Sequence, residues 1–141
     1  MVYIDTSVLA AYYCPEPLSA QAQSFLSQQA KPAISFLTET ELFSAVARKV
    51  RCDEIGQADA NRVLAKFSSH VDADLFIVIP VEKHHWRLAR GWIGLLTTPL
   101  RTLDALHLSI ASAEGIDLVT ADTTLYKAAE SLGVKAIHIS E

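Results

Sequence analysis

Short apolar runs alternate along this chain with longer stretches of helical character. The runs are rich in Val and Ile and short enough to be buried strands, and they cover residues 2–4, 33–36, 76–79, 117–120 and 134–139. Between them, apolar residues recur three or four positions apart, which is typical of helices that cover a sheet. Strands that alternate with helices favour a parallel sheet with helices on both faces. The sequence therefore predicts an α/β fold with five strands.

The expected helices follow the apolar spacing between these strands. We expect them over Asp5 to before Pro15, Leu18 to Gln29, Thr38 to Val50, about Ile55 to Val71, Glu82 to Leu96, Leu103 to Glu114 and Thr123 to Leu132. The helix from Leu103 is apolar on most sides, so we expect it to be central and buried. No repeat, linker or low-complexity segment interrupts the pattern, which predicts a single domain over residues 1–141.

Composition narrows the class of protein and its surroundings. Lys and Arg number 12, Asp and Glu number 16, and the formal net charge is −4, so nucleic acid could be bound only through a local basic patch. Two cysteines, Cys14 and Cys52, form neither a disulfide framework nor a CxxC pair, and this favours a reducing cytoplasm. No signal peptide is expected, and no run reaches the roughly 20 apolar residues that cross a membrane.

Four acidic residues lie where expected strands end or expected helices begin. Asp5 and Asp122 directly follow strands, Glu41 is about one helical turn past a strand, and Asp104 opens the apolar helix. Ligand sites in open α/β sheets lie outside the carboxyl ends of the strands, so we expect these side chains at one edge. Carboxylates gathered there would repel one another unless a cation lay between them. Oxygen ligands suit Mg²⁺ or Mn²⁺, whereas His and Cys would select zinc, so the pattern predicts metal-assisted phosphodiester hydrolysis by water.

Each acid also has an ordinary structural explanation. Asp5 and Asp122 could be N-caps, and Asp104 could favour the positive end of its helix. Thr38 and Glu41 match a capping box with Thr38 as the N-cap. Capping and metal binding are compatible, because a capped carboxylate keeps a free oxygen.

Several polar residues near these acids could support them. Thr6, Ser7 and Thr120 could orient a ligand carboxylate or a metal-bound water, or they could simply cap local backbone. His107 lies one turn after Asp104 on the apolar helix, and we expect a satisfied core histidine rather than a ligand or general base.

Basic residues occur in three places that could contact RNA. Arg101 precedes Asp104 closely, and Arg48 and Lys49 lie at the end of the helix that carries Glu41. A third stretch, residues 83–92, mixes Lys, His and Arg with Trp86 and Trp92. Such a mixture can hold phosphates and stack on unpaired bases, but it can also be a solvated helix face whose tryptophans are core.

The segments around the four acids resemble those of PIN-domain proteins. They read VYIDTS at residues 2–7, EL at 41–42, LDALHL at 103–108 and VTAD at 119–122, and their order and spacing match over nearly the whole chain. The short length is similar to that of VapC-type toxins from prokaryotic toxin–antitoxin pairs. The resemblance implies a PIN-like three-layer sandwich with a central parallel five-stranded sheet. It also implies metal coordination by Asp5, Glu41, Asp104 and Asp122.

The same resemblance implies an activity and partners. Family members are Mg²⁺-dependent endoribonucleases that commonly cut structured RNA such as tRNA or ribosomal RNA, leaving a 5′ phosphate and a 3′ hydroxyl. They usually form homodimers and are neutralised by a cognate antitoxin that covers the site. Many relatives carry a further acidic residue and an aromatic soon after the fourth Asp. Here Thr123-Thr124-Leu125 follows Asp122, so we expect a second metal site to be weak or absent.

Other functions remain to be weighed against this one. The chain could be a non-catalytic PIN-fold module that only binds a protein, with Tyr12, Tyr13, Leu18, Phe25 and Leu26 either in a docking groove or in the core. A haloacid-dehalogenase phosphatase would need Asp where Ser7 stands. A phospho-acceptor receiver would need Asp where Pro80 stands.

Overall fold

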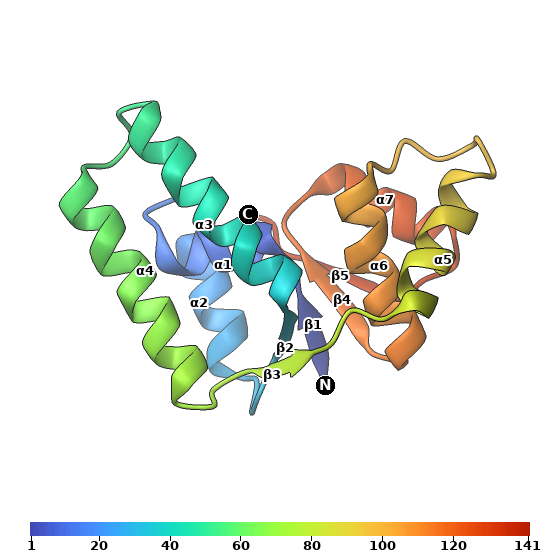
Figure 1. Cartoon of the computed structure of the whole chain (residues 1–141), viewed down its shortest axis with the longest axis horizontal. Coiled ribbons are helices and arrows are strands. Elements are labelled where there is room, and N and C mark those ends of the chain that lie inside the picture. Colours follow the sequence, from blue (N-terminus) through green and yellow to red (C-terminus); the bar gives the residue numbers. More distant parts are fainter.

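A five-stranded parallel sheet lies between two groups of helices in the computed structural model, which describes residues 1–141 (Figure 1). The strands are β1 (Val2–Ile4), β2 (Ala33–Ser35), β3 (Ile77–Ile79), β4 (Asp117–Thr120) and β5 (Ala136–His138). The helices are α1 (Thr6–Tyr13), α2 (Ser19–Ser27), α3 (Phe36–Arg51), α4 (Gln57–Asp72), α5 (Lys83–Ile93), α6 (Thr102–Glu114) and α7 (Thr123–Ser131). Helices α1 to α4 lie on one side of the sheet and α5 to α7 on the other, which confirms the α/β sandwich.

The strand order β3-β2-β1-β4-β5 places β1 at the centre of the sheet. The chain first builds outward from β1 to β3, and then crosses to the opposite side of β1 to form β4 and β5. Ile4 pairs with Val119 across the point where the strand order reverses. Side chains that follow β1 and β4 therefore meet at the crevice where open α/β sheets bind ligands.

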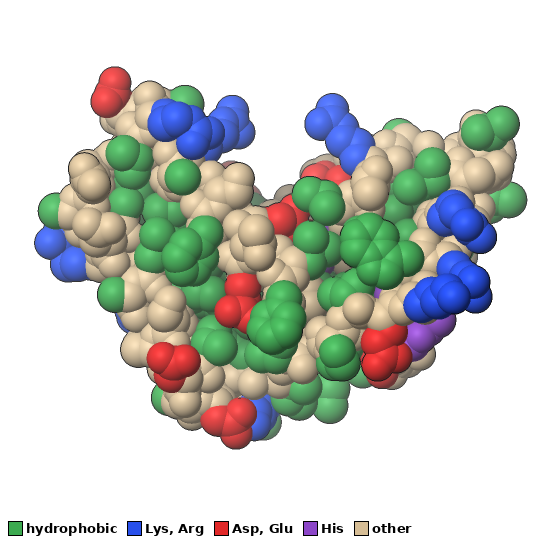
Figure 2. All heavy atoms as spheres, viewed as in Figure 1, with side chains coloured by type: hydrophobic (Ala, Val, Ile, Leu, Met, Phe, Trp, Pro, Cys, Tyr) green, Lys and Arg blue, Asp and Glu red, His purple; other side chains and the backbone are tan.

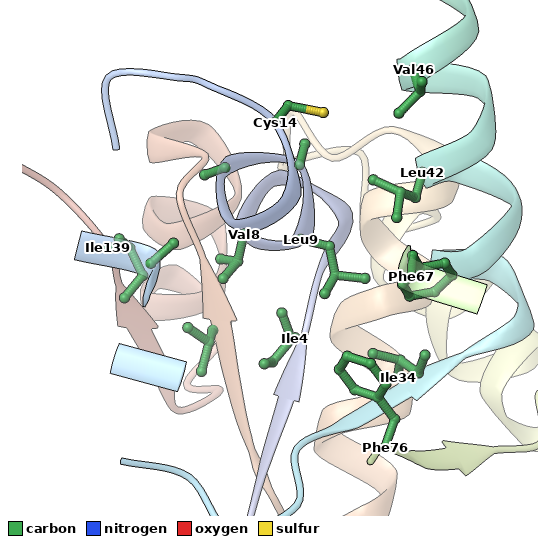
Figure 3. Close-up of a cluster of buried hydrophobic side chains, with 14 of the residues drawn as sticks. Ile4, Val8, Leu9, Cys14, Ile34, Leu42, Val46, Phe67, Phe76 and Ile139 are labelled. Carbon is green, nitrogen blue, oxygen red and sulfur yellow. The ribbon is translucent and has the colours of Figure 1, made fainter. Parts of the chain in front are cut away.

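Alternate residues of the strands form two hydrophobic cores. Ile4, Ile34 and Val119 face the core under α1 to α4, where Figure 3 shows Ile4, Leu9, Ile34 and Phe67 gathered together. Their neighbours Tyr3, Ala33 and Leu118 face the core under α5 to α7. Burial on both faces explains why these strands are nearly continuous apolar runs. Residues 105–111 of α6 are all buried, so the expected central helix is confirmed.

The start of α3 differs from the expected one. Phe36 begins this helix, Ser35 is its N-cap and Thr38 is the N3 residue of the capping box, so the capping box predicted from Thr38 and Glu41 is wrong. The Ser35 N–H donates to Thr38 Oγ1 at 3.2 Å, and the Thr38 side chain is fully buried. Thr38 therefore lies inside the first turn of α3 rather than at its N-cap, and Glu41 lies in the second turn.

Helix α5 ends at Ile93 rather than at Leu96. The Gly94 N–H donates to the Arg90 carbonyl, and Leu96 has a left-handed backbone with φ of 62°. The two cysteines are free, as expected. No helix combines the length and the apolar character that crossing a membrane would take.

Candidate metal centre

Two of the four acids are N-caps at the carboxyl end of the sheet. Asp5 follows β1, and its Oδ1 accepts the Val8 N–H at 3.2 Å at the start of α1. Asp122 follows β4, and its Oδ1 accepts two backbone N–H groups of α7, from Thr124 at 2.8 Å and from Leu125 at 3.2 Å. Both capping expectations are confirmed.

The other two acids project toward the same crevice from helices on opposite sides of the sheet. Glu41 is on α3, and Asp104 is in the first turn of α6. Burial raises the pKa of Asp104, and so do the negative charges of Asp122, Asp5 and Glu41. The structure therefore brings the four carboxylates close enough to interact. No three of them place oxygens within 4.8 Å of one another, and repulsion between like charges opposes closer approach.

Hydrogen bonds hold three of these carboxylates in place, and Thr120 is among the hydrogen-bond partners of Asp5. Besides Val8, Ser7 Oγ donates to Oδ1 of Asp5 at 2.6 Å. Thr6 Oγ1 donates to Oε1 of Glu41 at 2.8 Å, and His107 bonds to that same oxygen. Asp122 likewise uses only Oδ1. A set of carboxylates held in place at one crevice fits a hard divalent cation such as Mg²⁺ or Mn²⁺.

The pKa values of Asp5 and Glu41 shift in opposite directions because the surroundings of the two carboxyls differ. Asp5 is 4% exposed, and its burial raises the pKa of its carboxyl despite the hydrogen bond from Ser7. Burial also acts to raise the pKa of Glu41, but hydrogen bonds from His107 and Thr6 outweigh it and lower that pKa.

A buried polar network fixes the Glu41 side chain. A carboxylate only accepts hydrogen bonds, so His107 Nε2 carries the proton that it shares with Glu41. The Tyr3 hydroxyl lies 2.8 Å from His107 Nδ1 and also contacts Ser35 Oγ at 2.8 Å and Thr38 Oγ1 at 3.1 Å. Burial raises the pKa of Tyr3 to about 12, so its phenol stays protonated within this network.

His107 is thus the buried histidine that was expected, but its contact with Glu41 was missed. Its side chain is 2% exposed. One signal was available, because His107 lies three residues after Asp104 and so projects from the same face of α6. Nothing in the sequence pairs it with Tyr3 or Glu41.

Ser7 and Thr120 link the two strand ends that carry Asp5 and Asp122. The Ala121 N–H donates to Ser7 Oγ at 2.9 Å, and the Asp122 N–H donates to Thr120 Oγ1 at 3.0 Å. Ser7 Oγ and Thr120 Oγ1 are 3.4 Å apart. Thr6, Ser7 and Thr120 therefore all lie beside the acids, although their action on a metal stays a prediction.

Basic side chains flank this crevice on two sides. Figure 2 shows a hollow with Asp and Glu side chains on its floor and Lys and Arg side chains above the far end of α3 and the start of α6. Arg101 is exposed at the N-cap position of α6, and Arg48 is exposed in the last turn of α3. Lys49 is partly engaged, because its Nζ lies 3.0 Å from Glu16 Oε1.

A second group of possible metal ligands lies at the other end of α6. Potential ligand atoms of His84, His85 and Glu114 lie within 4.8 Å of one another. His85 Nδ1 accepts the Glu82 N–H at 2.9 Å, so its Nε2 carries the proton and donates to Glu114 Oε1 at 3.1 Å. Both ring nitrogens are therefore occupied, and the group ties α5 to α6. It is about 15 Å along α6 from Asp104.

Comparisons with known proteins identify the family and agree with the fold. The PIN domain family model matches residues 2–131. Ribonuclease VapC46 of Mycobacterium tuberculosis is 32% identical over 139 residues, covering 96% of this chain and 95% of that protein. The DNA-bound VapBC structure from Salmonella typhimurium aligns with a TM-score of 0.75 at 15% identity, covering 99% of this chain and 98% of the matched chain.

A further solved structure, the sarcin-ricin loop cleaving toxin VapC20 of Mycobacterium tuberculosis, aligns with a TM-score of 0.71 at 16% identity. The alignment covers 91% of this chain and 95% of that one. At such identities the solved structures establish a shared fold. The family model covers most of the sequence, and the VapC46 relative covers nearly all of it, so this chain belongs to the PIN-domain family.

Proposed function

We propose that this protein is a divalent-metal-dependent endoribonuclease of the VapC toxin type. The observation that carries the proposal is the arrangement of Asp5, Glu41, Asp104 and Asp122, which meet at one crevice with carboxylate oxygens left available. Two similar proteins support RNA as the substrate class, because VapC46 is named a ribonuclease and VapC20 is described as a toxin that cleaves the sarcin-ricin loop.

The four acids would hold Mg²⁺ or Mn²⁺, and the bound ion would supply a reactive water and offset charge on the phosphate. The chain's own contribution is to hold these carboxylates in place. Ser7 and the Val8 N–H fix Asp5, while Thr6 and His107 fix Glu41. Asp104 accepts no hydrogen bond from a protein side chain or backbone, so both of its oxygens are available.

The proposal includes the partners that VapC toxins have. We expect a structured RNA such as tRNA or ribosomal RNA as substrate, a homodimer, and a cytoplasmic setting. A cognate antitoxin is supported by fold neighbours, which include VapBC structures and a toxin–antitoxin complex from Klebsiella pneumoniae. The alternative is a non-catalytic PIN-fold module that binds only a protein. Metal binding without cleavage of any RNA would favour that alternative.

Calorimetric titration of Mn²⁺ into the antitoxin-free protein tests the metal centre. We expect one ion per chain, because no extra acid follows Asp122. Asp104→Asn should lower the affinity for Mn²⁺ at least 10-fold, as mutations around metal sites commonly do. Asp117→Asn is the matched control, because Asp117 lies at the opposite end of β4 and contacts Lys135. Absence of binding to the wild type, or equal binding to both variants, would contradict the proposal.

Arg101 is the first basic residue to test as a phosphate contact. We expect Arg101→Ala to raise KM for RNA several-fold with little change in kcat, and to reduce the slope of log affinity against log salt by roughly 0.7. Arg62→Ala is the control, because Arg62 is an exposed cation of α4 that pairs with Asp59. Equal salt slopes for Arg101→Ala and wild type would remove Arg101 from the RNA path.

A further inference from the structure

A surface of α5 combines a half-exposed tryptophan with three cations. Lys83, Trp86, Arg87 and Arg90 recur at helical spacing, so they share one face, and together they line a shallow depression of about 430 Å³. Trp86 is 51% exposed. We call this surface the α5 patch.

The cations of the α5 patch are free to bind a partner. Lys83, Arg87 and Arg90 are exposed, and none of them takes part in a salt bridge. The nearby acids Glu82 and Glu114 contact His84 and His85 instead. Figure 2 shows the Lys and Arg side chains standing clear of the surface over α5. In a chain of net charge −4, such a local positive cluster is complementary to a polyanion.

The surface next to the α5 patch extends to the start of α6. Trp86 and Arg90 also line a second depression of about 350 Å³, which continues over Ile93 and Gly94 to Thr102 of α6. Thr102 follows Arg101 directly and begins the helical turn that carries Asp104. The second depression therefore ends one residue from Arg101, the exposed cation at the N-cap of the helix that carries Asp104.

From the exposed tryptophan and the three cations on one face of α5, we infer that the α5 patch binds a single-stranded flank of the RNA, with Trp86 stacked on an unpaired base and Lys83, Arg87 and Arg90 against phosphates. The inference rests on the proposed ribonuclease function. Stacking on a tryptophan and contacts between phosphates and cations are the interactions that hold single strands in a positively charged groove. Trp86 is not part of the buried face of α5, which is formed by other residues, including His85 and Ala89.

Fluorescence titration with oligouridylate tests the patch without cleavage. The wild type is titrated in EDTA with 6- and 20-nucleotide RNA, and Trp92→Phe leaves Trp86 as the only tryptophan. We expect the 20-mer to quench Trp86, and Trp86→Ala to weaken its binding about 10-fold. Arg87→Ala and Arg90→Ala should each lower the salt slope by roughly 0.7. Arg62→Ala and Leu75→Ala are matched controls for an exposed cation and an exposed apolar residue.

Two further results separate this inference from its rivals. Polyglutamate serves as the probe for an acidic protein partner. If both polyglutamate and the RNA bind through the arginines, and Trp86→Ala changes neither affinity, stacking of RNA on Trp86 is overturned. With Mn²⁺ and total RNA, the Trp86→Ala and Arg90→Ala variants should show raised KM and retained kcat. Unchanged kinetics in both, with an active wild type, would overturn the inference and leave the ribonuclease proposal standing. An inactive wild type that nevertheless binds the 20-mer through Trp86 would instead refute the ribonuclease.

Discussion

Replacement of Asp104 by Asn is expected to lower RNA cleavage on the order of 100- to 1,000-fold, comparable to the loss of one strong electrostatic contact to a transition state. The substitution keeps the size of the side chain but removes its charge. Asp104 is the only one of the four acids that no protein hydrogen bond restrains, so its whole capacity as a ligand is available to a metal. Single-turnover cleavage of total RNA with Mn²⁺ measures the effect.

The same variant should be at least as stable as the wild type when EDTA is present. Burial and the charges of Asp122, Asp5 and Glu41 all raise the pKa of Asp104, which means that its ionised form is disfavoured in the folded state. Neutral Asn relieves that cost, which solvent screening keeps to about 1 kcal/mol or less. We therefore expect an unchanged or slightly higher Tm by thermal denaturation. A lost activity with a lowered Tm would point to unfolding rather than chemistry.

Two substitutions at Asp5 distinguish its role as the N-cap of α1 from its role in RNA cleavage. Both Asp5→Asn and Asp5→Ala should abolish cleavage to a similar degree as Asp104→Asn, because each removes a buried carboxylate of the crevice. Only Asn keeps an oxygen to accept the Val8 N–H and the Ser7 hydroxyl. The Ala variant should therefore be less stable than the Asn variant by about 1 kcal/mol, the usual cost of a lost N-cap.

Denaturant unfolding of both Asp5 variants in EDTA, beside cleavage assays, measures the two effects separately. Equal stability of the two variants would mean that the cap hydrogen bond contributes nothing to α1. Cleavage retained by Asp5→Asn, which is isosteric with the wild type, would contradict the role of Asp5 as a metal ligand.

The position of the acids could be predicted from sequence because it depends on local signals. Each short apolar run predicts a strand, and the carboxyl ends of parallel strands meet at one edge, so Asp5 and Asp122 were expected near each other. The structure brings Glu41 and Asp104 there as well. Their role as metal ligands remains a prediction until metal binding is measured.

The capping box of α3 could not be predicted from local pattern alone. Ser35-x-x-Thr38 and Thr38-x-x-Glu41 overlap, and the second matches the usual signature better. In the structure Thr38 pairs with Ser35, and its Oγ1 also lies 3.1 Å from the Tyr3 hydroxyl of the neighbouring strand. That contact joins residues 35 positions apart, so a local pattern does not reveal it. For the same reason, the bond between His107 and Glu41 could be seen only in three dimensions.

The α5 stretch shows another limit of sequence patterns. The spacing of its basic and aromatic residues predicts a helix with two distinct faces, but not which tryptophan is buried. Packing of α5 on α6 decides this, leaving Trp86 half exposed and Trp92 partly buried against the core.

The central place of β1 has a consequence for synthesis of the protein. A nascent chain emerges from its N-terminus, so Asp5 and Glu41 leave the ribosome well before Asp104 and Asp122. Until β4 emerges, β1 lacks the neighbour that pairs Ile4 with Val119, and the crevice has only one wall. A partly made chain therefore carries an incomplete set of carboxylates. Under the proposed function, fragments that end before Asp122 should therefore lack ribonuclease activity.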